Sequence, residues 1–304
     1  MAERNPSSMK IKRSLSFVIF EAVGYLYITL WAILCVLPFI LILSGSLTDD
    51  KIIVKHGYSL LPRGFTMRAY ETVFALPEKI MRSYGVTLFV TLAGTLLGLF
   101  CISMAGFALQ RKDLKYRNAI AFYIYFTTLF SGGLIPWYIM VANTLSMKNT
   151  IYALIIPSIM NPFLIFLMRN FLRTIPESIV ESAKIDGAGD FRIYRSLILP
   201  IATPALATVG LFLALAYWNN WFMSAMFIEN DKLFMLQFYL YNILAKADFM
   251  RSGITQAAVS VKIEIPRESV KLATAVVATG PVIFFYPFVQ KYFVQGLVIG
   301  AVKG

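Results

Sequence analysis

The sequence predicts an all-α integral membrane protein that crosses the membrane six times. Of its 304 residues, 58% are hydrophobic and only 14% are charged, whereas about a quarter of the residues in an average soluble domain are charged. The apolar residues gather in runs of about 20 or more, and a helix of that length crosses about 30 Å of hydrocarbon. A single membrane domain follows from these observations.

The six spans are predicted at residues 17–46, 85–109, 119–142, 150–172, 199–226 and 272–295. Every span except the second contains or adjoins a proline. A membrane helix tolerates proline only where neighbouring protein satisfies the freed carbonyl groups. We therefore expect kinked helices that pack against one another, with residues 1–16 as an arm before a domain of residues 17–304.

The positions of Lys and Arg in the short connections predict the orientation. Residues 110–118 carry four basic residues, whereas the connection at 143–149 carries only Lys148. Four more lie in the arm. The predicted location is a bacterial cell membrane, the inner or plasma membrane. The asymmetry places both termini on its cytoplasmic side. The predicted cytoplasmic segments are the arm, the 173–198 loop and the 296–304 tail, and the predicted external segments are 47–84 and 227–271.

The net charge of +12 is explained by attraction to anionic lipid headgroups, because the basic residues follow the helix ends. They are not interleaved with aromatic residues in a polar domain, so nucleic acid is not an expected partner. The sequence also has no Gly-rich phosphate loop, no paired histidines on a helix face and no nucleophile with a histidine partner in a span. We expect no catalytic residue, no metal site and no cofactor in this chain.

A polar stretch at residues 173–198 separates two long apolar segments and predicts two short helices joined by a turn. Pro176 suits the first turn of the first helix, and Gly187 suits the left-handed conformation that ends it. Asp190 is the predicted N-cap of the second helix, and Pro200 is predicted to open the fifth span. The pair is expected to lie at the membrane surface.

Each short helix has a predicted face. The first helix has one face formed by Glu181, Lys184 and Ile185, which are three and four residues apart. This face is a ridge that carries charged side chains and one protruding apolar side chain. The second helix has an apolar face of its own, formed by Phe191, Tyr194 and Leu197. From these residues alone, two interpretations are equally good: a docking element for another protein, or an interfacial amphipathic loop of the kind common in multi-span proteins.

The order of residues in this loop resembles the cytoplasmic signature with which permease subunits of ATP-binding-cassette importers dock on their ATPase. Glu-Ser-Ala at 181–183, Ile-Asp-Gly-Ala at 185–188 and Leu-Ile-Leu-Pro at 197–200 occur in register with it. One departure is Ser182, where the family's commonest residue is Ala. Because Ser is also small, the resemblance still implies docking.

Other stretches extend the resemblance over about residues 17–304. Residues 131–172, which begin with Ser-Gly-Gly-Leu-Ile-Pro, are similar to the maltose-type carbohydrate-uptake permeases, especially the branch for complex saccharides and uronate-containing oligosaccharides. The endings Gln-Lys-Tyr-Phe-Val-Gln-Gly at 290–296 and Gly-Ala-Val-Lys-Gly at 300–304 resemble that family too. The resemblance therefore implies the type I importer permease fold.

The resemblance also implies a set of partners and a mechanism. This chain would pair with a second, homologous permease subunit and sit on two copies of an ATPase, which bind ATP and Mg. An external solute-binding protein would deliver the carbohydrate, expected to be an oligosaccharide. Closure of the ATPase dimer would then drive alternating access, through a bistable element biased by the nucleotide.

Two groups of residues are assigned to the ATPase by the resemblance. The coupling residues are Glu181, Ser182, Ala183, Lys184, Ile185, Asp186 and Gly187. Among them, Glu181 is expected to meet a basic residue of the ATPase, the small Ser182 and Ala183 let the turn sit deep, and Asp186 with Gly187 shapes the turn. The tail residues are Gly300, Lys303 and Gly304.

A candidate substrate pathway joins amides with aromatic rings, because sugar hydroxyls bond to amides and sugar C–H faces stack on rings. Its residues are Asn161, Tyr217, Trp218, Asn219, Asn220 and Trp221. An interfacial belt is the alternative for the aromatic residues. Two other functions also stay open: a permease of the same superfamily for a non-sugar solute such as a peptide or an amino acid, and a membrane enzyme or assembly factor.

Overall fold

The computed structural model describes residues 14–251 and 266–301. Over these ranges the chain is mostly helical, and its strand-like pairing is limited to an isolated bridge between Thr48 and Phe65. The chain divides into two compact units. The first consists of Met1–Tyr70 and Pro266–Val276, and the second of Glu71–Ile265 and Val277–Gly304.

The first unit contains α1 (Leu15–Ser46), α2 (Asp50–His56) and the start of α16 (Glu268–Ala301). In α1, no residue of the most apolar 18-residue window is buried. A helix that is apolar on all sides is typical of a membrane span. The Oδ1 atom of Asp50 accepts hydrogen bonds from the backbone N–H groups of Glu268 at 2.7 Å and Ser269 at 3.1 Å. This carboxylate therefore caps the positive end of α16.

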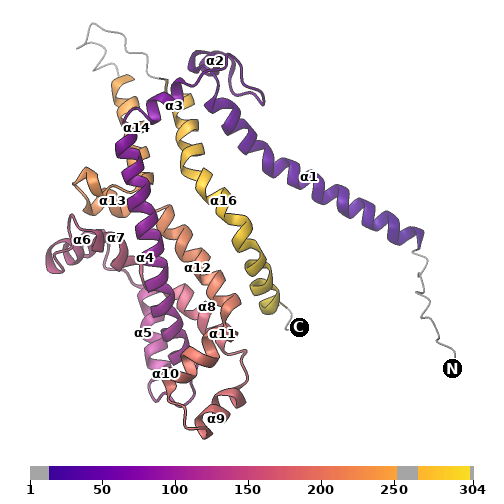
Figure 1. The fold of residues 1–304 in the computed structure, drawn as a ribbon, viewed down its shortest axis with the longest axis vertical. Helices are drawn as coiled ribbons and strands as arrows, with labels where there is room; N and C mark the ends of the chain where they lie inside the picture. The colour runs from indigo at the N-terminus through magenta and orange to yellow at the C-terminus, as the bar shows by residue number, and fades with distance from the viewer. Residues whose placement is uncertain (1–13, 252–265, 302–304) are drawn as a thin grey trace. The chain divides into compact units, whose positions relative to one another are not determined.

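The second unit is built around α4 (Pro77–Gln110), which is long enough to extend about 50 Å. The helices α8 (Pro162–Leu172) and α12 (Thr203–Trp218) pack along it (Figure 1). Small residues make this close packing possible. A Cβ atom at Gly98 would lie 3.0 Å from Leu213 of α12, and one at Gly106 would lie 2.8 Å from Met168 of α8.

Gly94 provides the tightest test of this packing. A Cβ atom there would lie 2.5 Å from the ring of Tyr217, which is buried and fixed by a 2.9 Å hydrogen bond from its hydroxyl to the carbonyl of Ile155. We expect Gly94→Ala to lower the stability of the protein by about 1–3 kcal/mol, because an overpacked core must shift its backbone. Gly85→Ala, in the same helix but with open space around it, is the control. Equal thermal unfolding temperatures of the two purified variants would contradict this prediction.

The two ends of α4 contact different parts of the chain. At its first turns, the Nζ atom of Lys79 forms a 2.6 Å ion pair with Asp231, and the hydroxyl of Thr87 accepts a 2.7 Å hydrogen bond from the N–H of Leu236. These contacts hold η4 (Asp231–Leu233) and α14 (Leu236–Arg251). At the other end lie α9 (Glu177–Ile185) and α10 (Asp190–Ile193) (Figure 1). The predicted coupling loop and the predicted external segment therefore lie at opposite ends of α4.

Helices occupy all six predicted ranges, but three of the predicted spans are broken. Residues 119–142 fall into α5 (Arg117–Leu129) and a segment made of α6 (Leu134–Ile139) and the π-turn η1 (Met140–Thr144), and the two axes differ by 116°. The helix breaks here because Gly133 adopts a left-handed φ of +88°, which ends helical geometry for most residues.

The fourth and fifth predicted spans are broken as well. The fourth consists of α7 (Ile151–Ile155), η2 (Ile156–Ser158) and α8, with a bend of 48° where prolines interrupt the chain. In the fifth, α12 ends at Trp218 and a separate helix α13 (Phe222–Phe227) follows. By length and composition, two helices of the described residues, α1 and α4, can each cross a membrane, or up to five segments if each bent pair is one span.

Candidate coupling site

The turn after α9 has the geometry that the sequence predicts at Gly187. This residue adopts a left-handed φ of +76°. Its N–H donates to the carbonyl of Lys184 at 3.0 Å, and the N–H of Ala188 donates to the carbonyl of Ala183 at 2.9 Å. These two hydrogen bonds form a Schellman motif, which satisfies the last carbonyls of the helix. Pro176 lies directly before α9, at the N-cap rather than in its first turn.

The second short helix begins and continues differently from the prediction. Its N-cap is Gly189, so the assignment of Asp190 as the cap was wrong by one residue. The helix α10 runs on through the π-turn η3 (Tyr194–Ile198) into α11 (Leu199–Ile201). Pro200 therefore lies inside this helical segment, and the fifth span begins after an 83° bend at Thr203.

The exposed edge of α9 carries the predicted ridge. Glu181, Lys184 and Ile185 are all exposed, and the side chain of Ile185 is 86% exposed although it is apolar. Glu181 forms no ion pair or hydrogen bond with any side chain in the described ranges. Ala183, by contrast, is 8% exposed and belongs to the main hydrophobic core. Its role is therefore to anchor α9 on its own chain rather than to face a partner.

The apolar face predicted for the second helix is only partly correct. Tyr194 is buried and Leu197 is half-buried, but the ring of Phe191 is 60% exposed. The inward positions are instead Ile193, Tyr194 and Ile198. Phe191 precedes the π-turn, and at 100° per residue it lies about 160° around α10 from the fully buried Ile193. Its ring is therefore left largely on the surface.

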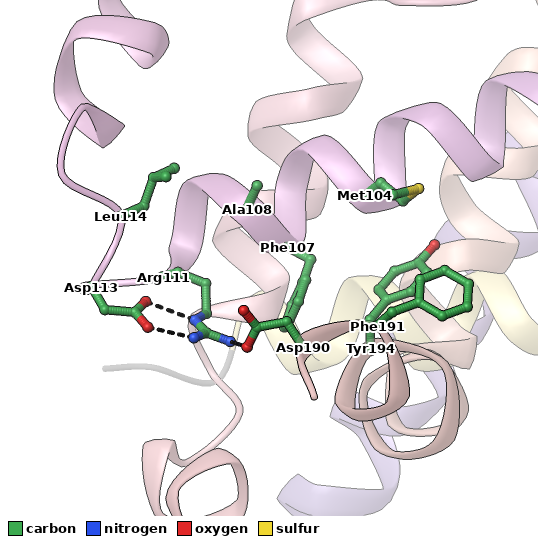
Figure 2. Close-up of a pocket in the computed structure, with 9 residues that line it drawn as sticks. All are labelled: Met104, Phe107, Ala108, Arg111, Asp113, Leu114, Asp190, Phe191 and Tyr194. Carbon is green, nitrogen blue, oxygen red and sulfur yellow. Dashed lines mark hydrogen bonds and ion pairs between the residues drawn. The ribbon is translucent and has the colours of Figure 1, made fainter. Parts of the chain in front are cut away.

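A basic residue from a different loop holds the two short helices together. Arg111, the residue that follows α4, is bonded to both carboxylate oxygens of Asp113, and its Nη1 atom donates to Asp190 at 2.8 Å (Figure 2). The side chain of Arg111 is only 11% exposed, and its guanidinium lies 5.6 Å from the ring centroid of Phe107. This fork binds α10 to the end of α4.

The segment that follows α4 also forms ion pairs with α9. The Nζ atom of Lys184 lies 2.8 Å from Asp113, and that of Lys112 lies 2.5 Å from Glu177. The Arg111 guanidinium and the Lys184 ammonium lower the pKa of Asp113 well below its usual range, mainly through these hydrogen bonds. Its carboxylate thus stays charged at any physiological pH. We call Arg111, Asp113, Lys184 and Asp190 the coupling network, which the sequence alone did not reveal.

The coupling network adjoins a hollow of about 390 Å³ between α4 and α10, with Met104, Phe107 and Phe191 in its wall (Figure 2). Beside it, the hydroxyls of Ser103 and Tyr194 form a buried 2.7 Å hydrogen bond. The rings of Phe107 and Tyr194 also pack at 5.5 Å. The second short helix is therefore fixed to α4 by polar and apolar contacts together.

We expect Arg111→Gln to reduce substrate-stimulated ATP hydrolysis by the assembled transporter roughly fivefold, because about 1 kcal/mol from a partly exposed ion-pair network corresponds to that factor. Lys115→Gln, which removes a charge from the same connection without breaking an ion pair, is the control. In a double-mutant cycle, Arg111→Gln and Asp190→Asn should be non-additive. Additive losses would show that the two residues act independently.

Two of the predicted pathway residues are core residues in this structure. Tyr217 is 1% exposed and bonds to Ile155, and Trp218 is 8% exposed and donates its Nε1–H to the carbonyl of Ala278 at 3.1 Å. The assignment of both as pathway residues is therefore corrected. The ring of Tyr217 fills the space beside Gly94 of α4, and the polar atoms of both residues bond to backbone carbonyls.

The other four pathway candidates lie at helix ends. Asn161 caps α8 by accepting from the N–H of Leu164 at 3.3 Å, and Asn220 accepts from that of Met223 at 3.0 Å. Asn219 donates to the carbonyl of Leu215. The ring of Trp221 is exposed and stacks on Tyr241 with a centroid separation of 5.2 Å. Each amide thus bonds to the backbone through one of its two polar groups, and the other has no hydrogen-bond partner among the described residues.

Sequence reasoning missed a hollow next to these residues. It has a volume of about 670 Å³ and is lined by the Gly-Gly turn after α5 together with Trp137 and Phe222. These two rings are nearly parallel, with centroids 6.4 Å apart. The sequence signal that could have found it was the Ser-Gly-Gly-Leu-Ile-Pro motif beside a tryptophan, read together with the aromatic pair at 221–222.

The predicted tail is partly helical. α16 continues to Ala301 and includes Gly300, whereas Lys303 and Gly304 lie outside the described residues. Within the described ranges, no group of three or more His, Cys, Asp or Glu side chains could hold a metal ion.

Residues 61–299 match the family described as binding-protein-dependent transport system inner membrane component. The polygalacturonan/rhamnogalacturonan transport system permease protein YtcP of Bacillus subtilis (strain 168) is 35% identical over 286 residues, which cover 94% of this chain and 99% of that protein. Protein LplC of the same strain is 34% identical and covers 94% of this chain and 95% of its own length.

A solved structure of another transporter contains a chain with a similar fold. It is the crystal structure of a bacterial ABC transporter involved in the import of the acidic polysaccharide alginate. One of its chains is similar with a TM-score of 0.75 and 31% sequence identity, over 93% of this chain and 99% of that one. The family match covers well over half of this sequence. The chain therefore belongs to the family of binding-protein-dependent transport system inner membrane components.

Proposed function

We propose that this chain is the permease subunit of an ATP-driven importer for an oligosaccharide that carries uronate groups. The observation that supports coupling to an ATPase is the exposed edge of α9, where Glu181 and Ile185 lie beside the turn at Gly187. Acidic sugar polymers appear in the names of both the YtcP relative and the alginate importer. That agreement favours a carbohydrate over a peptide or an amino acid.

The proposed partners are a second permease subunit, two ATPase subunits and an external solute-binding protein. The opposite placement of the coupling loop and of η4 with α14 along α4 supports the proposed orientation. The coupling end would face the cytoplasm, and the η4 end would face the binding protein. Both termini would then be cytoplasmic, and ATP and Mg would be bound by the ATPase alone.

The carbohydrate would pass along the surface formed by Asn161, Asn219, Asn220 and Trp221. The hollow lined by Trp137 and Phe222 adjoins this surface through α13. Its exposed rings suit the C–H faces of a sugar, and free amide groups suit the hydroxyls. A charged pathway is not required for an acidic sugar, because several neutral hydrogen bonds can hold a carboxylate.

The test is a reconstitution of the transporter with its binding protein in lipid vesicles. Oligogalacturonides are expected to stimulate ATP hydrolysis severalfold, whereas neutral maltooligosaccharides and peptides of similar size should leave it at the basal rate. Stimulation by peptides and by no saccharide would contradict the proposed substrate and favour a non-sugar permease. Stimulation by neutral sugars alone would contradict the uronate assignment while retaining the carbohydrate.

A further inference from the structure

Three arginines meet where α5 begins and α8 ends. Arg117 is the first residue of α5, Arg169 lies in the last turn of α8, and Arg173 is the residue that caps α8. α5 and α8 pack together, and the rings of Tyr125 and Phe166 touch edge to face with centroids 6.5 Å apart. The charges of Arg173 and Arg117 both act on that of Arg169.

The three arginines lack negative partners, unlike the cations of the coupling network. In the part of the chain that the structure describes, the nearby carboxylates are taken: Asp113 by Arg111 and Lys184, and Glu177 by Lys112. The remaining one, Glu181, is exposed on α9 and lines a hollow together with Arg117 and Arg173, but it forms no ion pair among the described residues. The Nε atom of Arg169 is buried and has no hydrogen-bond acceptor among these residues. Arg169 as a residue is partly exposed, and three neighbouring guanidinium groups without a paired carboxylate favour an anionic ligand.

A hollow of about 590 Å³ lies beside this group, which we call the arginine cluster. Arg117 and Arg173 line it, together with the 110–113 segment, which includes Asp113, the Thr174-Ile175-Pro176 segment and one side of α9. The hollow is large enough for a phosphate group with its substituent. Guanidinium groups bind phosphate with paired N–H donors, which makes arginine the residue suited to this anion.

The position of the cluster along the helices indicates the source of the phosphate. α5 is largely apolar from Ala119 onward, and α8 is apolar up to Met168, so the arginines stand at the boundary of the apolar segments. Lipid headgroups lie at this level, and basic pockets between membrane helices bind anionic ones. A soluble anion would have no reason to be matched to this depth.

We propose that the arginine cluster binds the phosphate of an anionic phospholipid headgroup. The bound lipid would neutralise the repulsion among the three guanidinium groups. Because Glu177, Val180, Glu181 and Lys184 line the same hollow, the lipid would also steady α9. This last step rests on the proposed function, whereas lipid binding itself does not.

The test uses the intact transporter, titrated with phosphatidylglycerol or phosphatidylcholine and observed by native mass spectrometry. The wild type should hold phosphatidylglycerol far more tightly than phosphatidylcholine. Arg117→Gln/Arg173→Gln should weaken phosphatidylglycerol binding about 30-fold, at about fivefold for each lost contact. The control Lys55→Gln/Arg63→Gln removes the same charge from exposed positions in α2 and in the segment after it and should bind like the wild type. Arg169→Gln, assayed in the same way, should also weaken binding.

Equal binding by the wild type and the double variant would overturn the proposal, whatever the transporter carries. Displacement of the lipid by millimolar inorganic phosphate would overturn the lipid as the occupant and assign the site to a soluble anion. The effect of the lipid on α9 is tested separately. Replacing phosphatidylglycerol with phosphatidylcholine should lower substrate-stimulated ATP hydrolysis in the wild type and not in the Arg117→Gln/Arg173→Gln variant. An unchanged rate with intact lipid binding would overturn that step alone.

Discussion

Replacing Gly187 with valine is expected to abolish substrate-stimulated ATP hydrolysis while the protein still reaches the membrane. At φ +76°, an L-residue costs roughly 1–2 kcal/mol, and a β-branched one costs more. The chain can relieve this strain only by opening the Schellman motif, which breaks the hydrogen bonds from Gly187 and Ala188. The angle between α9 and α10 would then change, and the docking surface with it.

Two variants serve as matched controls for this experiment. Gly189→Val changes the next glycine of the same loop, where φ is −70° and no atom would approach the new Cβ, and it should keep most of the stimulation. Gly187→Asn should be intermediate, because asparagine tolerates the left-handed region. Stimulation and uptake at normal levels in Gly187→Val cells would contradict the assigned role of the turn.

Charge reversal at Glu181 is expected to lower substrate-stimulated ATP hydrolysis about 30-fold or more. Glu181 lies exposed on α9, and its carboxylate pairs with no side chain in the described ranges, so the substitution breaks nothing within the chain. A lysine there would place a like charge against a basic residue of the ATPase. Losing a charge pair in an interface costs about 2–5 kcal/mol.

The control for this reversal is Glu71→Lys, which makes the same change of charge in the exposed helix α3 (Arg68–Val73). Its ATP hydrolysis should match that of the wild type, and both variants should assemble. Rates should be measured at low and high salt, because screening weakens exposed charge pairs. A Glu181→Lys transporter with normal stimulation at low salt would contradict the predicted contact.

Local features of the coupling loop were predictable because they depend on neighbours in the sequence. The helix over 177–185 followed from its spacing, and the left-handed turn followed from Gly187, where other residues are strained. The cap of the second helix was missed by one residue, since Asp190 is a better cap than glycine by propensity. Arg111 binds its carboxylate instead, and this tertiary contact overrides the local preference.

Long-range pairings could not be predicted from the sequence. Arg111 and Asp190 are 79 residues apart, and Lys184 and Asp113 are 71 apart, so each charge is visible but its partner is not. The face of α10 that turns inward is likewise set by tertiary packing, which buries Ile193 and leaves Phe191 exposed.

In the candidate pathway, residue type did not indicate burial. Tyr217 became a core residue because Gly94 of another helix leaves room for its ring. The sequence alone assigns no role to Arg169 at the end of a span. The burial of its Nε atom without an acceptor is a tertiary feature that the sequence does not show. Gly133 and the prolines indicate where the spans break, but the sequence does not indicate the angles between the helices on either side of each break.

The most direct test of the central claim, that the exposed edge of α9 meets the ATPase, is site-specific cross-linking. In a background with Cys35 and Cys101 replaced by alanine, Ile185→Cys should cross-link to the ATPase subunit, because this side chain is 86% exposed on that edge. Lys148→Cys, in the connection predicted to lie on the other side of the membrane, should not. A cross-link from position 148, or none from position 185 in the assembled transporter, would contradict the claim.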